Sequence, residues 1–300
     1  MKSIHTPVLL QEVIEGLTSG RSHNSTLWYL DGTLGGAGHA LAIAQALHGK
    51  INLIGLDRDE QAIERAQNTF VGKTEKTILE NESFRNLDRV LEKHAIGSVD
   101  LILLDVGLSS DELEGSGRGF SFQKDEPLLM TMGDPAKYPF TASRIVNDWE
   151  EEDIANVIFG YGEERFARRI ARALIVYRKK KIIQTSGELA EIAKNAVPAF
   201  YRRGKTHPAT KTFQALRIAV NDELEALREG LVKGWKHLSP GGRMAVISFH
   251  SLEDRIVKDF YKAQALLGGK IITKKPITAS LEETYTNPRS RSAKLRIIEK

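Results

Sequence analysis

The sequence predicts an α/β protein whose doubly wound, mostly parallel sheet is interrupted by an inserted all-helical domain. Short apolar runs alternate with helical patterns at both ends of the chain, which is typical of a parallel sheet covered on both faces. The alternation stops after Ser110 and resumes near residue 212. We therefore expect a sheet domain of residues 1–110 and 212–300 and an insertion of residues 111–211.

The first part of the chain supplies the beginning of the sheet. Several apolar runs end at an aspartate, at Asp31, Asp57 and Asp105. Short continuous apolar runs of this kind are typical of strands that are buried on both faces. The segments between them carry apolar residues three or four positions apart, as amphipathic helices do. We expect strands at 27–31, 51–56, 77–79 and 99–104, and helical segments at 7–17, 39–47, 60–70 and 84–91.

The insertion shows helical patterns and no convincing strand. Its clearest helix is expected from Glu163 to Tyr177, with a second from Gly187 to Ala196. Residues 161–211 hold thirteen Lys or Arg against four Asp or Glu, whereas the rest of the chain is net acidic. Such a basic segment predicts a polyanionic partner, although a solvated lysine-rich surface is the alternative. Four arginines share one face of the first helix: Arg165, Arg168, Arg169 and Arg172.

The last part of the chain returns to the α/β pattern. Apolar residues step by three or four from Phe213 to Leu238, which predicts one long helix ended by Pro240–Gly242. A strand at 244–249 and a helix at 252–263 follow. Residues 271–272 and 295–298 are expected to close the sheet as an antiparallel pair.

Composition excludes several classes of protein. The chain has no cysteine, which rules out disulfides, thiolate metal sites and a cysteine nucleophile. No apolar run reaches the roughly 18 residues of a membrane span, and no signal-peptide pattern opens the chain. We therefore expect a cytoplasmic protein. No group of His, Asp and Glu has a convincing metal-ligand spacing, so we predict no metal.

A glycine-rich loop, Gly32 to His39, separates the first strand from the first helix of the sheet domain. Glycines allow a ligand to approach the backbone, and the following helix N-terminus offers free N–H groups. Asp57 lies 19 residues after Gly38, a spacing that suits a carboxylate accepting hydrogen bonds from ribose hydroxyls. Together these features predict a cofactor that contains adenosine.

Two adenosine cofactors compete for this loop. A dinucleotide fingerprint requires a small third residue, but the string from Gly36 places Leu41 there. S-adenosylmethionine has no pyrophosphate, and a carboxylate from Asp31 or Asp105 would suit its cationic end. We therefore favour S-adenosylmethionine, with a nicotinamide-dependent oxidoreductase as the alternative.

The residues after the fourth strand would face the transferred methyl group. They run from Asp105 to Ser110 and lack the Pro-Pro-aromatic string of the DNA amino-methyltransferases. A methyltransferase therefore remains the interpretation, outside that DNA group. His39, His207 and His250 each adjoin the end of an expected element.

Several long strings resemble one family. They are residues 5–10, 31–39, 105–110, 118–122, 161–167, 207–215, 247–258 and 287–292. These strings are similar to those of the RsmH (MraW) family, the bacterial 16S ribosomal RNA cytosine-N4 methyltransferases. The resemblance implies a class I, Rossmann-like fold, S-adenosylmethionine as cofactor, and a decoding-centre cytosine of 16S rRNA in the small ribosomal subunit as substrate. It leaves open whether the chain forms a homodimer.

The resemblance also implies site residues. Three positions depart from the family, which usually has Gln at Glu112, an Asp at Leu129 and an Arg at Thr131. A third hypothesis, a non-catalytic RNA-binding factor on this fold, rests on those departures. Cofactor contacts are implied at Ala37, Gly38, His39, Asp57, Phe84, Asp105 and Glu112.

The chemistry requires further groups. A cytosine amine is a poor nucleophile, so an enzyme must align it and accept its proton. We expect Asp105 in that role, with His250 as the second candidate. The base must leave its stack, and Phe120 and Phe122 are candidates to stack on it. Further RNA contacts are expected from Arg118, Arg165, Arg168, Arg169, Arg172 and Lys211.

Overall fold

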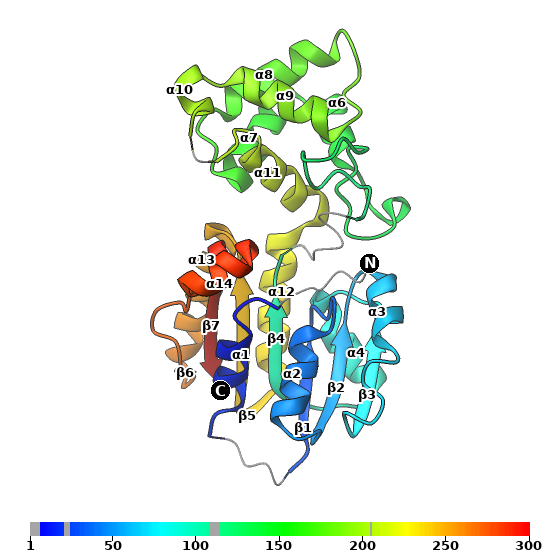
Figure 1. Cartoon of the computed structure of the whole chain (residues 1–300), viewed down its shortest axis with the longest axis vertical. Helices are drawn as coiled ribbons and strands as arrows, with labels where there is room; N and C mark the ends of the chain where they lie inside the picture. Colours follow the sequence, from blue (N-terminus) through cyan, green and yellow to red (C-terminus); the bar gives the residue numbers. More distant parts are fainter. Residues whose placement is uncertain (1–6, 21–24, 108–114, 205) are drawn as a thin grey trace. The chain divides into compact units, whose positions relative to one another are not determined.

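The computed structural model describes residues 7–20, 25–107, 115–204 and 206–300. The chain divides into two compact units (Figure 1). The first, the sheet unit, combines residues 1–107 with 224–300, and the second, the helical unit, comprises residues 108–223. The helical unit therefore extends beyond residue 211, where the sequence analysis placed its end. None of the described helices is long and apolar enough to cross a membrane.

The described part of the sheet unit holds a seven-stranded sheet in the order β3-β2-β1-β4-β5-β7-β6. Strands β1 to β5 pair in parallel, and β7 runs antiparallel to both β5 and β6. This confirms the expected fold class and the expected antiparallel closing pair. The strands are β1 Leu27–Asp31, β2 Ile51–Leu56, β3 Lys76–Glu80, β4 Val99–Asp105, β5 Leu238–Ser248, β6 Lys270–Ile271 and β7 Lys294–Glu299.

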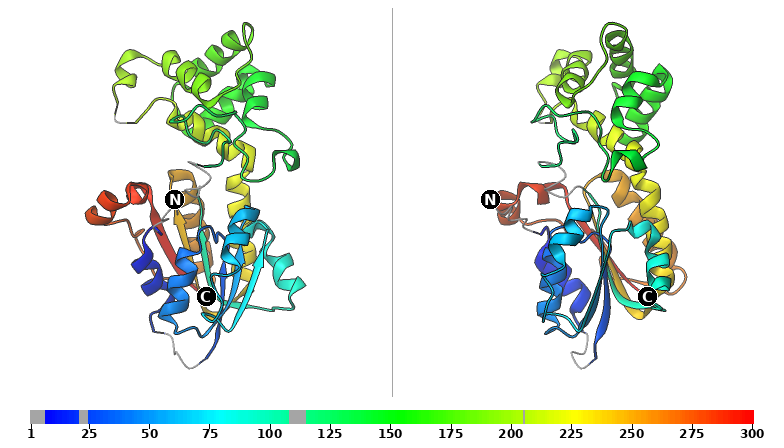
Figure 2. Two further views of the ribbon diagram at one scale, coloured as in Figure 1. Left: turned by 45° about the vertical axis from the view of Figure 1, so that its right-hand side comes forward. Right: turned by 90° about the vertical axis from the view of Figure 1, so that its right-hand side faces the viewer.

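Helices cover both faces of this sheet (Figure 2). Neighbouring strand residues point to opposite faces, so Leu53 packs with the α1 and α2 layer and Ile54 packs with the α4 and α12 layer. One layer contains α1 Leu10–Thr18, α2 Gly38–Ala46 and α3 Glu60–Ala66, and the other contains α4 Leu87–Lys93, α12 Glu223–His237 and α13 Ser251–Ala265. The shorter helices are η1 Phe84–Asn86, α14 Leu281–Thr286 and η3 Pro288–Ser292.

The helical unit has its own apolar core and, in its described residues, no strand. Ile158, Ile170 and Leu189, from three different helices, are among the buried side chains that form this core. The helices are η2 Pro135–Lys137, α6 Ala142–Asp148, α7 Glu151–Gly162, α8 Ala167–Arg178, α9 Ser186–Ala196, α10 Ala199–Arg202 and α11 Thr210–Asn221.

Two of the expected helices are wrong in their extent. The long helix expected from Phe213 to Leu238 is two helices, because Asp222 adopts a left-handed backbone with φ of 48° between α11 and α12. β5 then begins at Leu238 itself, earlier than residue 244. Pro240–Gly242 lies inside that strand, where Gly241 has φ of 72°.

The helix expected from Glu163 begins later, at Ala167. Glu163 is the left-handed residue that ends α7, with φ of 49°. The buried carboxylate of Glu164 fixes the turn, because it accepts hydrogen bonds from the Phe166 N–H at 2.8 Å and the Tyr201 hydroxyl at 2.7 Å. Arg165 therefore lies in a turn and not on the helix that carries the other three arginines.

Candidate active site

The expected cofactor residues lie where the sheet changes its winding direction. β1 has β2 on one side and β4 on the other, so the chain segments that follow β1 and β4 diverge. In open α/β sheets, ligands bind at this switch point, outside the carboxyl ends of the strands. Asp31 ends β1, Asp105 ends the neighbouring β4, and Asp57 directly follows β2.

The glycine-rich loop is tied to three strands. The Thr33 N–H donates to Asp31 Oδ1 at 3.1 Å, and the Thr33 hydroxyl oxygen accepts the Asp105 N–H at 2.7 Å. The Leu34 N–H donates to the Leu56 carbonyl at 2.9 Å, at the end of β2. The sequence predicted a loop here, and the structure shows that its polar groups hold it in place.

The start of α2 requires small residues. Ala37, immediately before the helix, is buried and has a left-handed backbone with φ of 63°. A Cβ on Gly38 would lie 2.3 Å from Pro7 Cγ. The helix N-terminus is thus brought against the N-terminal segment, and its free N–H groups lie at the carboxyl edge of the sheet.

Asp57, the expected ribose ligand, is held by two backbone N–H groups. Its Oδ2 accepts the Gly35 N–H at 2.7 Å, and its Oδ1 accepts the Asp59 N–H at 2.9 Å. Burial raises the pKa of Asp57, and these two backbone N–H groups oppose that shift. Each carboxylate oxygen has a second lone pair, so both remain able to accept a hydroxyl proton.

Asp31, at the end of β1, is hydrogen-bonded on both sides. Its carboxylate is buried and accepts the Tyr29 hydroxyl at 2.9 Å in addition to the Thr33 N–H. Burial raises the pKa of Asp31 to about 6, although the nearby His39 and both hydrogen bonds act in the opposite direction. A bound cation would favour the ionised carboxylate further.

Asp105 has an unsatisfied carboxyl oxygen. Its Oδ1 is buried and has no hydrogen-bond partner among the described residues. Burial, followed by the neighbouring charge of Glu253, raises the pKa of Asp105 to about 7. A buried polar atom without a partner is rare, and a ligand bound at this edge of the sheet would satisfy it. The position fits the cationic end of S-adenosylmethionine, or an amine presented to it.

His39 faces the other oxygen of Asp105. Its Nδ1 lies 3.7 Å from Asp105 Oδ2, while its Nε2 lies 2.9 Å from the Val8 carbonyl, to which it donates in the neutral ring. Burial lowers the pKa of His39. Burial thus favours the uncharged form of both groups, so we treat them as a polar contact and not as an ion pair.

Phe84 packs beside the same loop. A Cβ on Gly32 would lie 2.9 Å from Phe84 Cβ, and a Cβ on Gly230 would lie 2.6 Å from Phe84 Cδ2. The Arg58 guanidinium lies 6.0 Å from the Phe84 ring centre. The ring therefore borders the segment that follows β1. Glu112, the remaining expected cofactor residue, lies outside the described residues.

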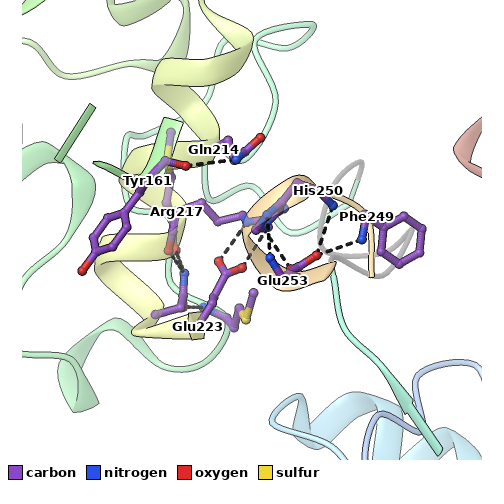
Figure 3. A network of polar contacts seen from close by, with 10 residues as sticks. Tyr161, Gln214, Arg217, Glu223, Phe249, His250 and Glu253 are labelled. Carbon is purple, nitrogen blue, oxygen red and sulfur yellow. Dashed lines mark hydrogen bonds and ion pairs between the residues drawn. The ribbon is translucent and has the colours of Figure 1, made fainter. Parts of the chain in front are cut away.

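His250 has a structural partner that the sequence analysis missed. It is the N-cap of α13, where its side chain accepts the Glu253 N–H, and Glu253 bonds back to the His250 backbone. The buried Glu253 carboxylate also accepts the Phe249 N–H at 2.8 Å (Figure 3). In the string His-Ser-Leu-Glu, the glutamate follows the histidine by three positions, as in a capping box. This spacing was the sequence signal that could have predicted the cap.

Three expected RNA contacts hold the helical unit together. Arg118 Nη1 donates to the Thr131 and Gly133 carbonyls at 2.7 and 3.0 Å. Lys211 Nζ donates to the Glu163 carbonyl at 2.8 Å. Phe120 is buried in the core, so it presents no ring face to a base in this conformation. Burial among apolar side chains, which sequence alone does not reveal, explains the placement of Phe120.

Other aromatic groups of this unit also have partners. Phe122 stacks on His207, with ring centres 4.5 Å apart, and His207 Nδ1 accepts the Ala209 N–H. The Arg165 guanidinium lies 4.8 Å from the Phe166 ring and 4.9 Å from the Tyr201 ring.

The remaining expected RNA contacts are exposed on α8. They are Arg168, Arg169 and Arg172, and Arg172 Nε lies 3.3 Å from Glu151 Oε1. Of the three positions that depart from the family, two lie among the described residues: Leu129 is half-buried, and Thr131 is buried with its hydroxyl donating to the Gly133 carbonyl. Thr131 thus has a local structural role.

The chain is similar to proteins of one kind along its whole length. The profile of the MraW methylase family matches residues 2–300. Three relatives carry the name ribosomal RNA small subunit methyltransferase H. The one from Brevibacillus brevis is 43% identical, covering 99% of this chain and 98% of its own. Those from Deinococcus deserti and Heliobacterium modesticaldum are 48% and 45% identical, covering 93% and 98% of their own chains.

These matches decide between the two cofactors. A methylase uses S-adenosylmethionine as its methyl donor, so the nicotinamide-dependent oxidoreductase is excluded. The aspartates at the ends of β1 and β4 and the Asp57 carboxylate fit that cofactor. The protein is therefore an S-adenosylmethionine-dependent methyltransferase and belongs to the MraW methylase family.

Proposed function

We propose that the protein methylates the N4 amine of a decoding-centre cytosine in 16S rRNA, within the small ribosomal subunit. The names of the relatives support a small-subunit rRNA substrate. The observation that carries the proposal is the buried Oδ1 of Asp105, which has no hydrogen-bond partner among the described residues and lies at the edge of the sheet where the expected cofactor residues gather.

The bound cofactor supplies an electrophilic methyl group. Asp105 Oδ1 accepts a hydrogen bond from the exocyclic amine, which orients the nitrogen and draws electron density toward it. The pKa of Asp105 is about 7, close to neutral pH, so the carboxylate can also accept the proton that the amine releases. His250 acts indirectly, because its ring caps α13 and its backbone N–H is held by Glu253.

The helical unit binds the RNA in this proposal. The excess of nine positive charges over residues 161–211 supports that role. Arg168 and Arg169 are exposed on α8, and neither side chain pairs with another residue in the part of the chain that the structure describes. They are therefore available for phosphate groups.

Radiolabelled cofactor tests the proposal directly. The protein is incubated with tritiated S-adenosylmethionine and small ribosomal subunits that lack the modification, and the labelled nucleotide is mapped. Label on N4 of a single decoding-centre cytosine is expected. Label on another nucleotide would contradict the substrate. Binding of the subunit without any label would instead favour the non-catalytic RNA-binding factor.

A further inference from the structure

A groove runs between α8 and α9 of the helical unit. Its volume is about 920 Å³, within the range of pockets that enclose small molecules. Both helices belong to the same unit and pack against each other, so the groove is a feature of that unit alone. The expected cofactor residues among those described above all lie in the sheet unit, and the proposed function uses Arg168 and Arg169 of this groove for phosphates but gives no role to the apolar residues beside them.

The two walls of the groove differ in charge. The α8 wall presents three arginines, at 168, 169 and 172, and between them and Tyr177 it presents Ala173 and Val176. Val176 is 53% exposed, which is unusual for a β-branched apolar side chain on a helix. An arginine rim above an apolar floor suits a ligand that combines anionic groups with flat apolar faces.

The α9 wall is polar and only weakly repels anions. It contributes Ile192 to the floor and Asn195 to the rim. Its two glutamates have local cationic partners, since Glu188 bonds to Lys181 and Glu191 Oε1 accepts from Lys194 Nζ at 2.9 Å. The exposed Asn195 amide offers both a donor and an acceptor to the edge of a base.

From this arrangement we propose that the groove binds an unstacked nucleotide of single-stranded RNA. The base lies on Val176 and Ile192, and its flanking phosphates contact Arg168 and Arg169. Proteins recognise unpaired RNA through splayed bases, usually on aromatic side chains, and through cationic side chains along the backbone; in this groove aliphatic side chains take the place of the aromatic ones. This inference rests on the proposed function, because it requires that the helical unit engages RNA. It adds a base-binding site separate from the target pocket.

A matched pair of variants tests the floor of the groove. Val176→Glu places a charge on the floor, whereas Val232→Glu makes the same change at a 58% exposed valine of the sheet unit. Affinity of the full-length protein for a single-stranded pyrimidine RNA is measured by fluorescence anisotropy. We expect Val176→Glu to weaken binding about tenfold, in line with the loss of one stacked base, and Val232→Glu to change it less than about twofold. Both variants should melt near the wild-type temperature, since both valines are exposed.

An abasic RNA separates base contact from simple charge repulsion. If Val176 contacts a base, wild type should bind an oligonucleotide with abasic positions weakly. The Val176→Glu variant should then bind that oligonucleotide with nearly the same affinity as wild type. Equal losses on intact and abasic RNA would overturn the proposal in favour of phosphate contacts alone. Wild-type affinity retained by Val176→Glu would also overturn it.

The methyl-transfer assay distinguishes this failure from failure of the proposed function. If wild type labels small ribosomal subunits but the groove variant binds RNA normally, only the groove assignment is lost. If wild type neither labels the subunit nor binds RNA, the proposed function itself fails.

Discussion

The polar groups of the sheet unit and those of the helical unit are arranged in opposite ways. At the switch point the carboxyl groups are enclosed, and the side chain of Asp105 is only 16% exposed. On α8 the arginines are open, and the side chain of Arg172 is 77% exposed. Burial shifts the pKa of a side chain and fixes its orientation. An exposed charged side chain instead attracts opposite charges over a distance, and salt screens that attraction. The sheet unit is therefore suited to chemistry and the helical unit to capture of a polyanion.

The largest effect expected from this comparison is on turnover. Asp105→Ala removes the amine acceptor and should lower the single-turnover methyl-transfer rate by about 10²–10⁴-fold, the usual contribution of a proton-accepting group. The rate is measured with saturating cofactor and ribosomal subunits. Full activity in a variant that binds both ligands would remove Asp105 from the reacting centre.

A second effect concerns stability in the absence of cofactor. Burial raises the pKa of Asp105 to about 7, whereas an aspartate in an unfolded chain titrates near 4. Between these values the unfolded chain releases the proton and the folded chain keeps it, so the free energy of unfolding falls as pH rises, by up to about 4 kcal/mol.

Asp105→Asn lacks this titration. Its melting temperature should match wild type near pH 4 and exceed it near pH 8, as thermal melts at both pH values would show. The same offset between variant and wild type at both pH values would argue that the folded carboxyl titrates normally.

The third effect is on cofactor affinity. Asp57→Ala should weaken S-adenosylmethionine binding by about 1.5–3 kcal/mol, because the ribose hydroxyls lose the charged carboxylate to which they donate. Calorimetry measures this, and Asp59→Ala, which changes the neighbouring acid, serves as the control. Unchanged affinity in Asp57→Ala would exclude Asp57 as the ribose ligand.

The smallest effect is on the salt dependence of RNA binding. Replacing Arg168, Arg169 and Arg172 together with Ala should flatten the slope of log affinity against log salt by up to about two units, at roughly 0.7 per lost phosphate contact. Cofactor affinity should not change. Arg228→Ala, an exposed arginine of α12, is the control. A parental slope combined with a lowered melting temperature would show that the three arginines serve the fold.

Sequence patterns predicted the sheet well, because strand and helix periods differ and because β1, β2 and β4 each end at or directly before an aspartate. The break at Asp222 escaped prediction, since apolar spacing continues across it and the residue is not a glycine. The start of α8 was predicted too early, because the spacing does not reveal the turn that Glu164 fixes before Ala167. Loop and spacing predicted a ribose-binding role for Asp57, and the family resemblance implied the other cofactor contacts; these roles stay predictions. The backbone contacts of Arg118 and Lys211 were not predicted, because their acceptors are carbonyl groups far along the chain.

The hydrogen bonds that fix the glycine-rich loop also determine when the site becomes ordered. Asp57 accepts the Gly35 N–H, Asp31 accepts the Thr33 N–H, and Thr33 accepts the Asp105 N–H, so all three bonds join groups of the sheet unit itself. The loop entropy is therefore lost as the sheet forms and not when the cofactor arrives. Amide hydrogen exchange at Gly35, Thr33 and Asp105 should therefore be slow in the free protein. The rate of cofactor association should be limited by the encounter of the two molecules more than by rearrangement of the loop.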